Sequence, residues 1–273
     1  MTSSVEITLW GGLTAVKKEV VVDTFLPHPA ADAPAETFFN ALSACRSTSH
    51  LFSAICGHYL GSRQGPKNTQ SPYAFHYHNP TEYHITEVVV LKRRFVIQHE
   101  GFVFRVHHQP EHGPAEPDFL ICVDRNIDSI FSFHKVAIDR INCSVVHPRA
   151  LQGTFRRPVV WRMSQVDGNY EFNLNLLQVG VLLQAIVTPN PIPPYRTLRV
   201  NCFLHSRVIR TVLHYIIQAQ QIPNSNITVT AHEPHVRGVT LGKCFGFRLD
   251  REDPGEPAAI FTTYRGRYTW LTA

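Results

Sequence analysis

Three short β-rich runs follow one another in the middle of the chain, and they limit the folds open to it most strongly. They are HITEVVVL (residues 84–91), HEGFVFRV (99–106) and DFLICVDR (118–125), separated by basic or Pro-, Gly- and His-containing segments. Short runs rich in β-branched and aromatic residues, with turn-forming segments between them, are typical of neighbouring antiparallel strands. The sequence therefore predicts a three-stranded antiparallel meander.

Apolar residues at helical intervals predict helices on both sides of this meander. The first covers residues 36–59. A second, buried helix lies within residues 169–187, and four prolines in the segment TPNPIPPY prevent it from continuing. A third helix starts at Cys202, with Asn201 in the favourable N-cap position.

Further strands are expected near both ends of the chain. Residues 5–22 carry two β-type runs around the Gly11-Gly12 pair, and β-type composition returns in residues 239–249 and 258–264. The sequence as a whole predicts an α+β fold in which an antiparallel sheet packs against helices.

The chain of 273 residues is near the upper end for one compact domain. We expect a single domain over residues 1–273, with the core in residues 80–218. Residues 1–60 form either part of that domain or an N-terminal extension or lobe.

Composition points to an intracellular protein without a membrane span. The six cysteines are scattered without CxxC pairs, so we expect free thiols in a reducing compartment. The N-terminus does not resemble a secretory signal, and no 18-residue apolar window occurs, so we expect a cytoplasmic or nuclear location. The 26 Lys and Arg residues against 21 Asp and Glu residues are spread in small pairs, which favours a solvated surface over a nucleic-acid groove.

Cys202 is the candidate nucleophile, because a thiol at a helix N-terminus is favoured as thiolate by unpaired N–H groups and by the helix dipole. Such a thiol needs an imidazole to take its proton and a polar group to orient the ring. His99 opens one strand and Asp124 closes the next, so an antiparallel hairpin brings their ends together. His84, which opens the preceding strand, is the competing base or third member.

Histidines crowd the segment from His76 to His112, which raises the question of a zinc site. Most of them fall in segments that are typical of loops, and no cysteine pair or HExxH helix accompanies them. We therefore expect exposed loop histidines, with one or two buried and hydrogen-bonded, and no metal or other cofactor.

The motifs Tyr83-His84, His99-Glu100, Val123-Asp124-Arg125 and Asn201-Cys202-Phe203 resemble a family of uncharacterised basidiomycete fungal proteins. That family has His-His before one strand, His-Glu before the next, Ile-Asp-Arg closing a third, and Asn-Cys-Tyr-Trp-Phe opening a helix. Two departures occur here: Tyr83 replaces the first His, and Leu204-His205 stands where the family has Trp-Phe.

This order of motifs is similar to that of circularly permuted papain-like enzymes of the lecithin-retinol acyltransferase kind, in which the His strands precede the Cys helix. The resemblance implies a permuted papain-like arrangement, with His99 or His84 as base and Cys202 as nucleophile. The first functional hypothesis is a thiol hydrolase or acyltransferase acting on an amide or ester of a protein or small molecule. The alternative is a catalytically inactive papain-like module that binds a protein partner. The sequence does not identify the substrate, the partner or the oligomeric state.

Overall fold

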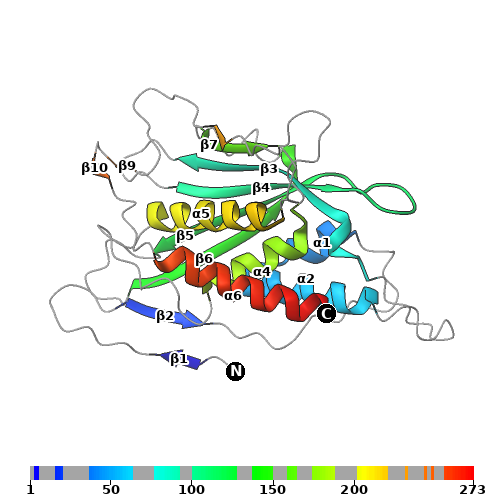
Figure 1. Cartoon of the computed structure of the whole chain (residues 1–273), viewed down its shortest axis with the longest axis horizontal. Coiled ribbons are helices and arrows are strands. Elements are labelled where there is room, and N and C mark those ends of the chain that lie inside the picture. The colour runs from blue at the N-terminus through cyan, green and yellow to red at the C-terminus, as the bar shows by residue number, and fades with distance from the viewer. Residues whose placement is uncertain are drawn as a thin grey trace.

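A computed structural model gives the fold of the chain (Figure 1). It describes residues 3–5, 16–20, 37–63, 77–92, 100–127, 137–149, 159–164, 174–187, 202–220, 231–232, 243–244, 247–248 and 255–273.

An eight-stranded sheet forms the centre of the molecule, with the strand order β1-β2-β6-β5-β4-β3-β7-β8. Strands β3 (Tyr83–Lys92), β4 (Glu100–His108) and β5 (Phe119–Ile127) are consecutive antiparallel neighbours. The predicted meander is therefore confirmed and lies in the middle of the sheet.

Two strands that the sequence pattern does not predict extend the meander on both sides. Strand β6 (Ala137–Val146) pairs with β5, and β7 (Val159–Ser164) pairs with β3, both antiparallel. Charged residues such as Arg140 and Arg162 interrupt their apolar runs, which weakens the composition signal. On the far side of β7, β8 (Ala231–His232) forms an edge.

Short strands also occur in two of the three terminal segments for which strands are predicted, although residues 6–15 lie outside the described part of the chain. Strands β1 (Ser3–Val5) and β2 (Val16–Val20) are antiparallel to each other, and β2 joins the sheet parallel to β6. Strands β9 (Lys243–Cys244) and β10 (Phe247–Arg248) make a separate two-stranded ladder.

The helix predicted over residues 36–59 is two helices, α1 (Phe38–Ser43) and α2 (Thr48–Arg63). The Thr37 hydroxyl accepts the Asn40 N–H at 3.3 Å, and the Ser47 hydroxyl accepts the His50 N–H at 3.2 Å. Each hydroxyl satisfies a donor that the first turn of a helix leaves unpaired. The second cap starts a new helix, which periodicity alone does not indicate.

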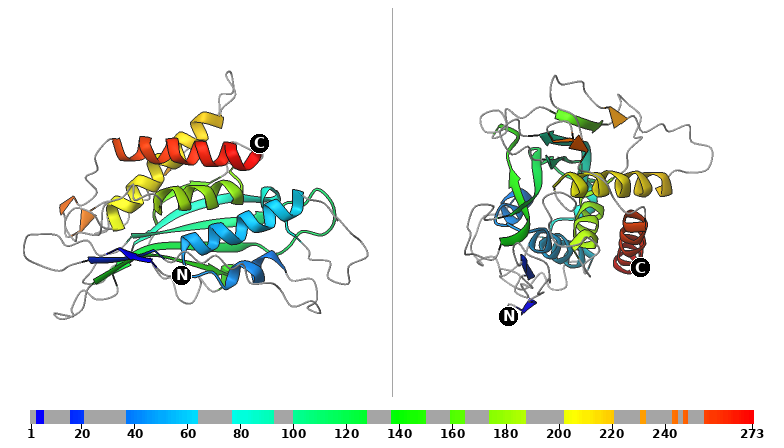
Figure 2. Two further views of the ribbon diagram at one scale, coloured as in Figure 1. Left: turned by 90° about the horizontal axis from the view of Figure 1, so that it is seen from below. Right: turned by 90° about the vertical axis from the view of Figure 1, so that its left-hand side faces the viewer.

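The other two predicted helices are confirmed as α4 (Leu176–Val187) and α5 (Cys202–Gln220). Together with α2 and α6 (Gly255–Thr272) they lie on one face of the sheet (Figure 2). Helix α4 packs between α2 and α6, and α5 contacts α6 and strands β4 and β5. None of the described helices is both long and apolar enough to cross a lipid bilayer.

The prediction of a strand over residues 258–264 is wrong, because this segment belongs to helix α6. Ile260 and Tyr264 are buried four residues apart, as one helix face requires. The Thr262 hydroxyl donates to the carbonyl four residues earlier at 3.0 Å. Burial of one helical stripe against the core outweighs the β-type composition here.

Two apolar clusters define the two faces of the sheet. Val90, Phe102 and Val123 belong to the main cluster, which includes buried residues of all five helices. Val103 and Cys122 belong to a second cluster on the opposite face. Because successive side chains of a strand alternate between faces, this division fixes the direction of every candidate side chain on these strands.

Residues of the predicted N-terminal extension contribute directly to the main cluster. Phe38 and Leu42 of α1 and Leu51 and Ile55 of α2 are completely buried and belong to it. This part of residues 1–60 therefore packs into the core.

Gly180 allows α4 to approach α2 closely, because a Cβ atom at this position would lie 3.1 Å from Ile55 Cδ1. We expect Gly180→Val to lower the free energy of unfolding by about 1 kcal/mol through overpacking. Gly266→Val in α6 is the matched control, since a Cβ there has no neighbour within 4 Å. Equal urea midpoints for the two variants would contradict this account of the α2–α4 contact.

Candidate active site

The apolar stripes of three neighbouring strands become charged at one end of the helix-covered face. In each strand a charged residue lies two positions from an apolar residue of the main cluster and therefore on the same face. The pairs are Lys92 and Val90, Glu100 and Phe102, and Arg125 and Val123. The exposed fractions of Lys92, Glu100 and Arg125 are only 0%, 1% and 2%. Charged side chains are almost never buried to this extent without a partner or a function.

Lys92 and Glu100 are directly opposite each other in the β3–β4 ladder. The Lys92 Nζ atom lies 3.4 Å from Glu100 Oε1, and both side chains are completely buried. Burial of an ion pair is costly unless the two charges stay together. This pair therefore forms a buried polar site at one end of the helix-covered face of the sheet.

Helix α5 shows the same change from apolar to polar along its buried stripe. Its later turns bury Ile209, Val212, Leu213, Ile216 and Ile217, whereas its first turn buries three polar or reactive side chains. These are Cys202, His205 and Ser206, at positions i, i+3 and i+4, with exposed fractions of 2%, 2% and 1%. We call the six residues Lys92, Glu100, Arg125, Cys202, His205 and Ser206 the polar end of the core.

Aromatic contacts place α5 over the half of the sheet that ends in Lys92 and Glu100. The Arg210 guanidinium of α5 lies 5.9 Å from the Trp161 ring, which lies 6.3 Å from the Phe102 ring. In the ladder, Trp161 is opposite Val90. Figure 2 shows α5 closest to the sheet at its N-terminal end and farther away at its C-terminal end.

Cys202 differs in its surroundings from the other described cysteines, all of which are free and buried. Cys45, Cys56 and Cys143 belong to the main apolar cluster and Cys122 to the second, whereas Cys202 belongs to neither. Burial raises the pKa of Cys45 to about 11 and that of Cys56 to about 12. Those two thiols are therefore unreactive at neutral pH.

The structure does not bring Asp124 to Cys202. As the predicted hairpin requires, Asp124 lies opposite Gly101, at the start of β4. Its side chain, however, alternates with the main-cluster residues of β5 and shares the face of Cys122, away from α5. His99 lies outside the described residues.

His84 also lies away from Cys202. Its neighbours Tyr83 and Ile85 belong to the main cluster, so the His84 side chain projects to the opposite face, where it pairs with His107. It is also at the far end of β3 from Lys92. Burial, with a smaller contribution from His107, lowers the His84 pKa.

Most residues of the polar end are not predicted from the sequence as site residues. The sequence does contain a sign of it, because the polar residues His205 and Ser206 lie in the same helical stripe as the apolar residues Ile209 and Val212. A polar residue in an apolar stripe is informative when the stripe proves to be buried.

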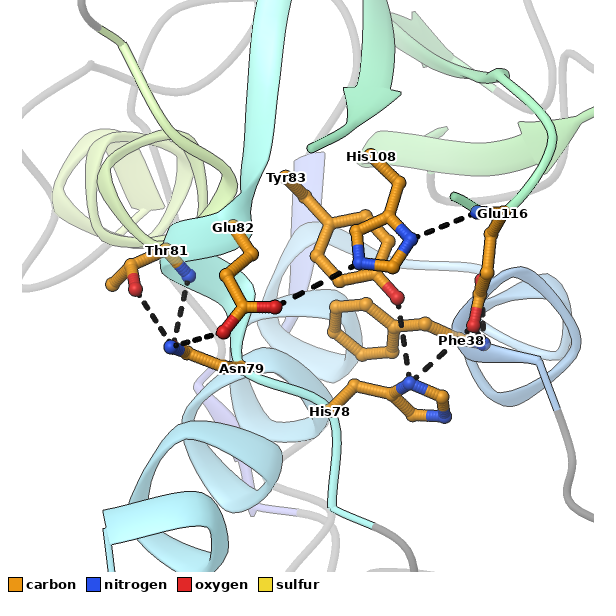
Figure 3. A network of polar contacts seen from close by, with 8 residues as sticks. All are labelled: Phe38, His78, Asn79, Thr81, Glu82, Tyr83, His108 and Glu116. Carbon is orange, nitrogen blue, oxygen red and sulfur yellow. Dashed lines mark hydrogen bonds and ion pairs between the residues drawn. The ribbon is translucent and has the colours of Figure 1, made fainter. Parts of the chain in front are cut away.

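A second polar cluster lies at the opposite end of the same sheet face (Figure 3). We call it the histidine network, and its members are His58, His78, Glu82, Tyr83, His108 and Glu116. The His108 ring stacks on the Tyr83 ring at 4.2 Å. The Tyr83 hydroxyl lies 3.3 Å from His78 Nδ1, which is 3.5 Å from Glu116 Oε1.

Glu116 links the β4–β5 connection to the start of α1 through hydrogen bonds. Its carboxylate accepts the Phe38 N–H at 3.1 Å, where the helix dipole favours a negative charge. Its own N–H donates to His108 Nδ1 at 2.9 Å. These contacts give the network a structural role.

Two histidines of the network, His58 and His108, are held in neutral form. His108 Nδ1 accepts the Glu116 N–H, and His58 Nδ1 accepts the His78 N–H at 3.3 Å, so neither atom carries a proton. Burial and the neighbouring His78 lower the pKa of His58 to about 4. Burial also lowers the His108 pKa, although Glu116 and Glu82 oppose this shift.

The crowded histidine segment contains one buried, hydrogen-bonded histidine of the kind expected from the sequence, His108, and a half-buried one, His78. Among the described residues, no group of three or more His, Cys, Asp or Glu side chains is arranged to hold a metal ion.

Comparison with known proteins finds no matching family model, no similar curated protein and no similar solved structure. A functional assignment therefore depends on the chemistry of the polar end.

Proposed function

We propose that the protein is a thiol hydrolase or acyltransferase that acts on an amide or ester, with Cys202 as the nucleophile. One observation carries this proposal: Cys202 is a buried thiol at the first residue of a 19-residue helix and lies outside both apolar clusters. The N–H groups of the first helical turn and the positive end of the dipole favour a thiolate there. The position of this helix on the antiparallel sheet is compatible with a permuted papain-like arrangement.

The reaction proceeds in two steps. The Cys202 proton passes to an imidazole, Sγ bonds to the carbonyl carbon, and N–H groups of the first turn of α5 stabilise the oxyanion. The imidazolium then gives its proton to the leaving amine or alcohol as the bond to the carbonyl carbon breaks. Water, or an acceptor hydroxyl or amine, attacks the acyl-cysteine and restores the thiol. The resemblance implies His99 or His84 as this imidazole, and His84 projects to the other face of the sheet, which leaves His99.

Alkylation kinetics test this proposal directly. We expect Cys202 to react with iodoacetamide already at about pH 6–7, because a thiolate stabilised at a helix start forms well below the ordinary thiol range. Peptide mapping by mass spectrometry gives the rate at each cysteine as a function of pH. Cys56 is the internal control and should stay unreactive, since burial raises its pKa to about 12.

Cys202→Ser should remove the fast alkylation at pH 6–7 and leave the alkylation rates of the other thiols unchanged. If Cys202 reacts as slowly as Cys56 across the whole pH range, the acyl-cysteine mechanism fails. The inactive protein-interaction module is then the better explanation of the fold.

A further inference from the structure

The first turn of α5 carries an imidazole on the same buried helix face as the thiol. His205 follows Cys202 by three residues, and both side chains are 2% exposed. Side chains at this spacing lie on one helix face with Cβ atoms about 5–6 Å apart, and both lean toward the N-terminus. His205 is therefore directed back over the turn in which Cys202 lies.

Ser206 gives an independent indication that this turn receives a ligand. Its side chain is 1% exposed, and its Oγ atom has no hydrogen-bond partner in the described part of the chain. A buried hydroxyl left without a partner is destabilising. A polar group that enters the polar end, such as a substrate carbonyl, would satisfy it.

We propose that His205 is the proton acceptor of Cys202, an inference that rests on the proposed function. The Cys202 Sγ–H proton moves to a His205 ring nitrogen as Sγ forms its bond to the substrate carbonyl carbon. The same proton leaves with the amine or alcohol when the acyl-cysteine forms. His205 thus takes the role that the resemblance leaves to His99.

The charges around the first turn of α5 link the protonation of His205 to that of Cys202. Lys92, Glu100 and Arg125 lie on the face of the sheet that the helices cover, and Arg210 lies two turns further along α5. The positive dipole end and the nearby cations disfavour an isolated imidazolium but favour a thiolate. A charged His205 is therefore stable only while the Cys202 thiolate is beside it, so removing either partner must change the titration of the other.

Alkylation of Cys202 in two matched variants tests this inference. In His205→Gln the apparent pKa for alkylation should rise by at least about one unit, whereas in His99→Gln it should not change. If His99→Gln raises it and His205→Gln does not, His205 is not the partner, but the thiol enzyme stands. If wild-type Cys202 shows no low-pH reactivity, the proposed function itself fails.

An NMR titration tests whether His205 is the proton acceptor of Cys202 even if the His205→Gln variant does not fold. In protein with ring-labelled histidines, Cys202→Ser should lower the pKa of His205 by at least about one unit, because the neighbouring thiolate is lost. The resonances of His58 and His108, at the other end of the sheet, should not move. An unchanged His205 titration overturns the inference.

Discussion

Replacing Glu100 by glutamine is expected to lower the free energy of unfolding by about 3–5 kcal/mol, because it removes the carboxylate charge beside the buried Lys92 ammonium group. The two side chains are completely buried and 3.4 Å apart. Urea unfolding at pH 7.5, followed by tryptophan fluorescence and by circular dichroism, measures the loss.

The double variant Lys92→Met, Glu100→Met is the informative control. It removes both charges and keeps similar volumes, so it should recover most of the stability lost in either single variant. The interaction energy from the double-mutant cycle should therefore be several kcal/mol and should show that Lys92 and Glu100 attract each other. If the single variants lose less than about 1 kcal/mol each, the pair is solvated and the polar end is open to water.

Acidification from pH 7.5 to 5 is expected to destabilise the fold by about 2–3 kcal/mol, through histidines that are neutral when folded. The folded state lowers the pKa of His58, His84, His108 and His214, in each case chiefly by burial. Over this interval the unfolded chain binds more protons than the native state does. Stability is therefore fully present above the ordinary histidine pKa and is lost as the pH falls below it.

His58 contributes a definable part of this effect. Its pKa of about 4 in the fold corresponds to a full effect of about 3 kcal/mol, which solvent screening of the half-buried ring reduces to about 1–2 kcal/mol. His58→Gln keeps a side-chain acceptor for the His78 N–H but removes the titration. The urea midpoint of this variant should fall less steeply with pH than that of the wild type.

His112→Gln is the matched control, because the His112 side chain is exposed in the connection between β4 and β5. It should leave the pH dependence near that of the wild type. If His58→Gln and the wild type show the same slope between pH 7.5 and 5, the histidine network does not control acid stability.

The sequence was sufficient to predict those elements in which hydrophobic periodicity and boundary residues favour the same secondary structure. The meander of β3, β4 and β5 and the helices α4 and α5 each combine regular periodicity with suitable boundaries. Prediction failed where tertiary packing outweighed composition, as in α6, and where charged residues interrupted a strand, as in β6 and β7. It also missed the cap at Ser47, which divides one periodic stretch into two helices.

For the candidate site, the sequence by itself determined that Cys202 opens a helix and that His84 lies near the start of a strand. Asp124 lies inside β5, which continues to Ile127, and not at its end as predicted, and His99 is outside the described residues. Only the tertiary structure decided which face of the sheet the helices cover. Alternation within a strand places neighbours on opposite faces but does not say which face is buried. The helices cover the face of Lys92, Glu100 and Arg125, so Asp124 and His84 project away from Cys202 while His205 and Ser206 share its buried stripe.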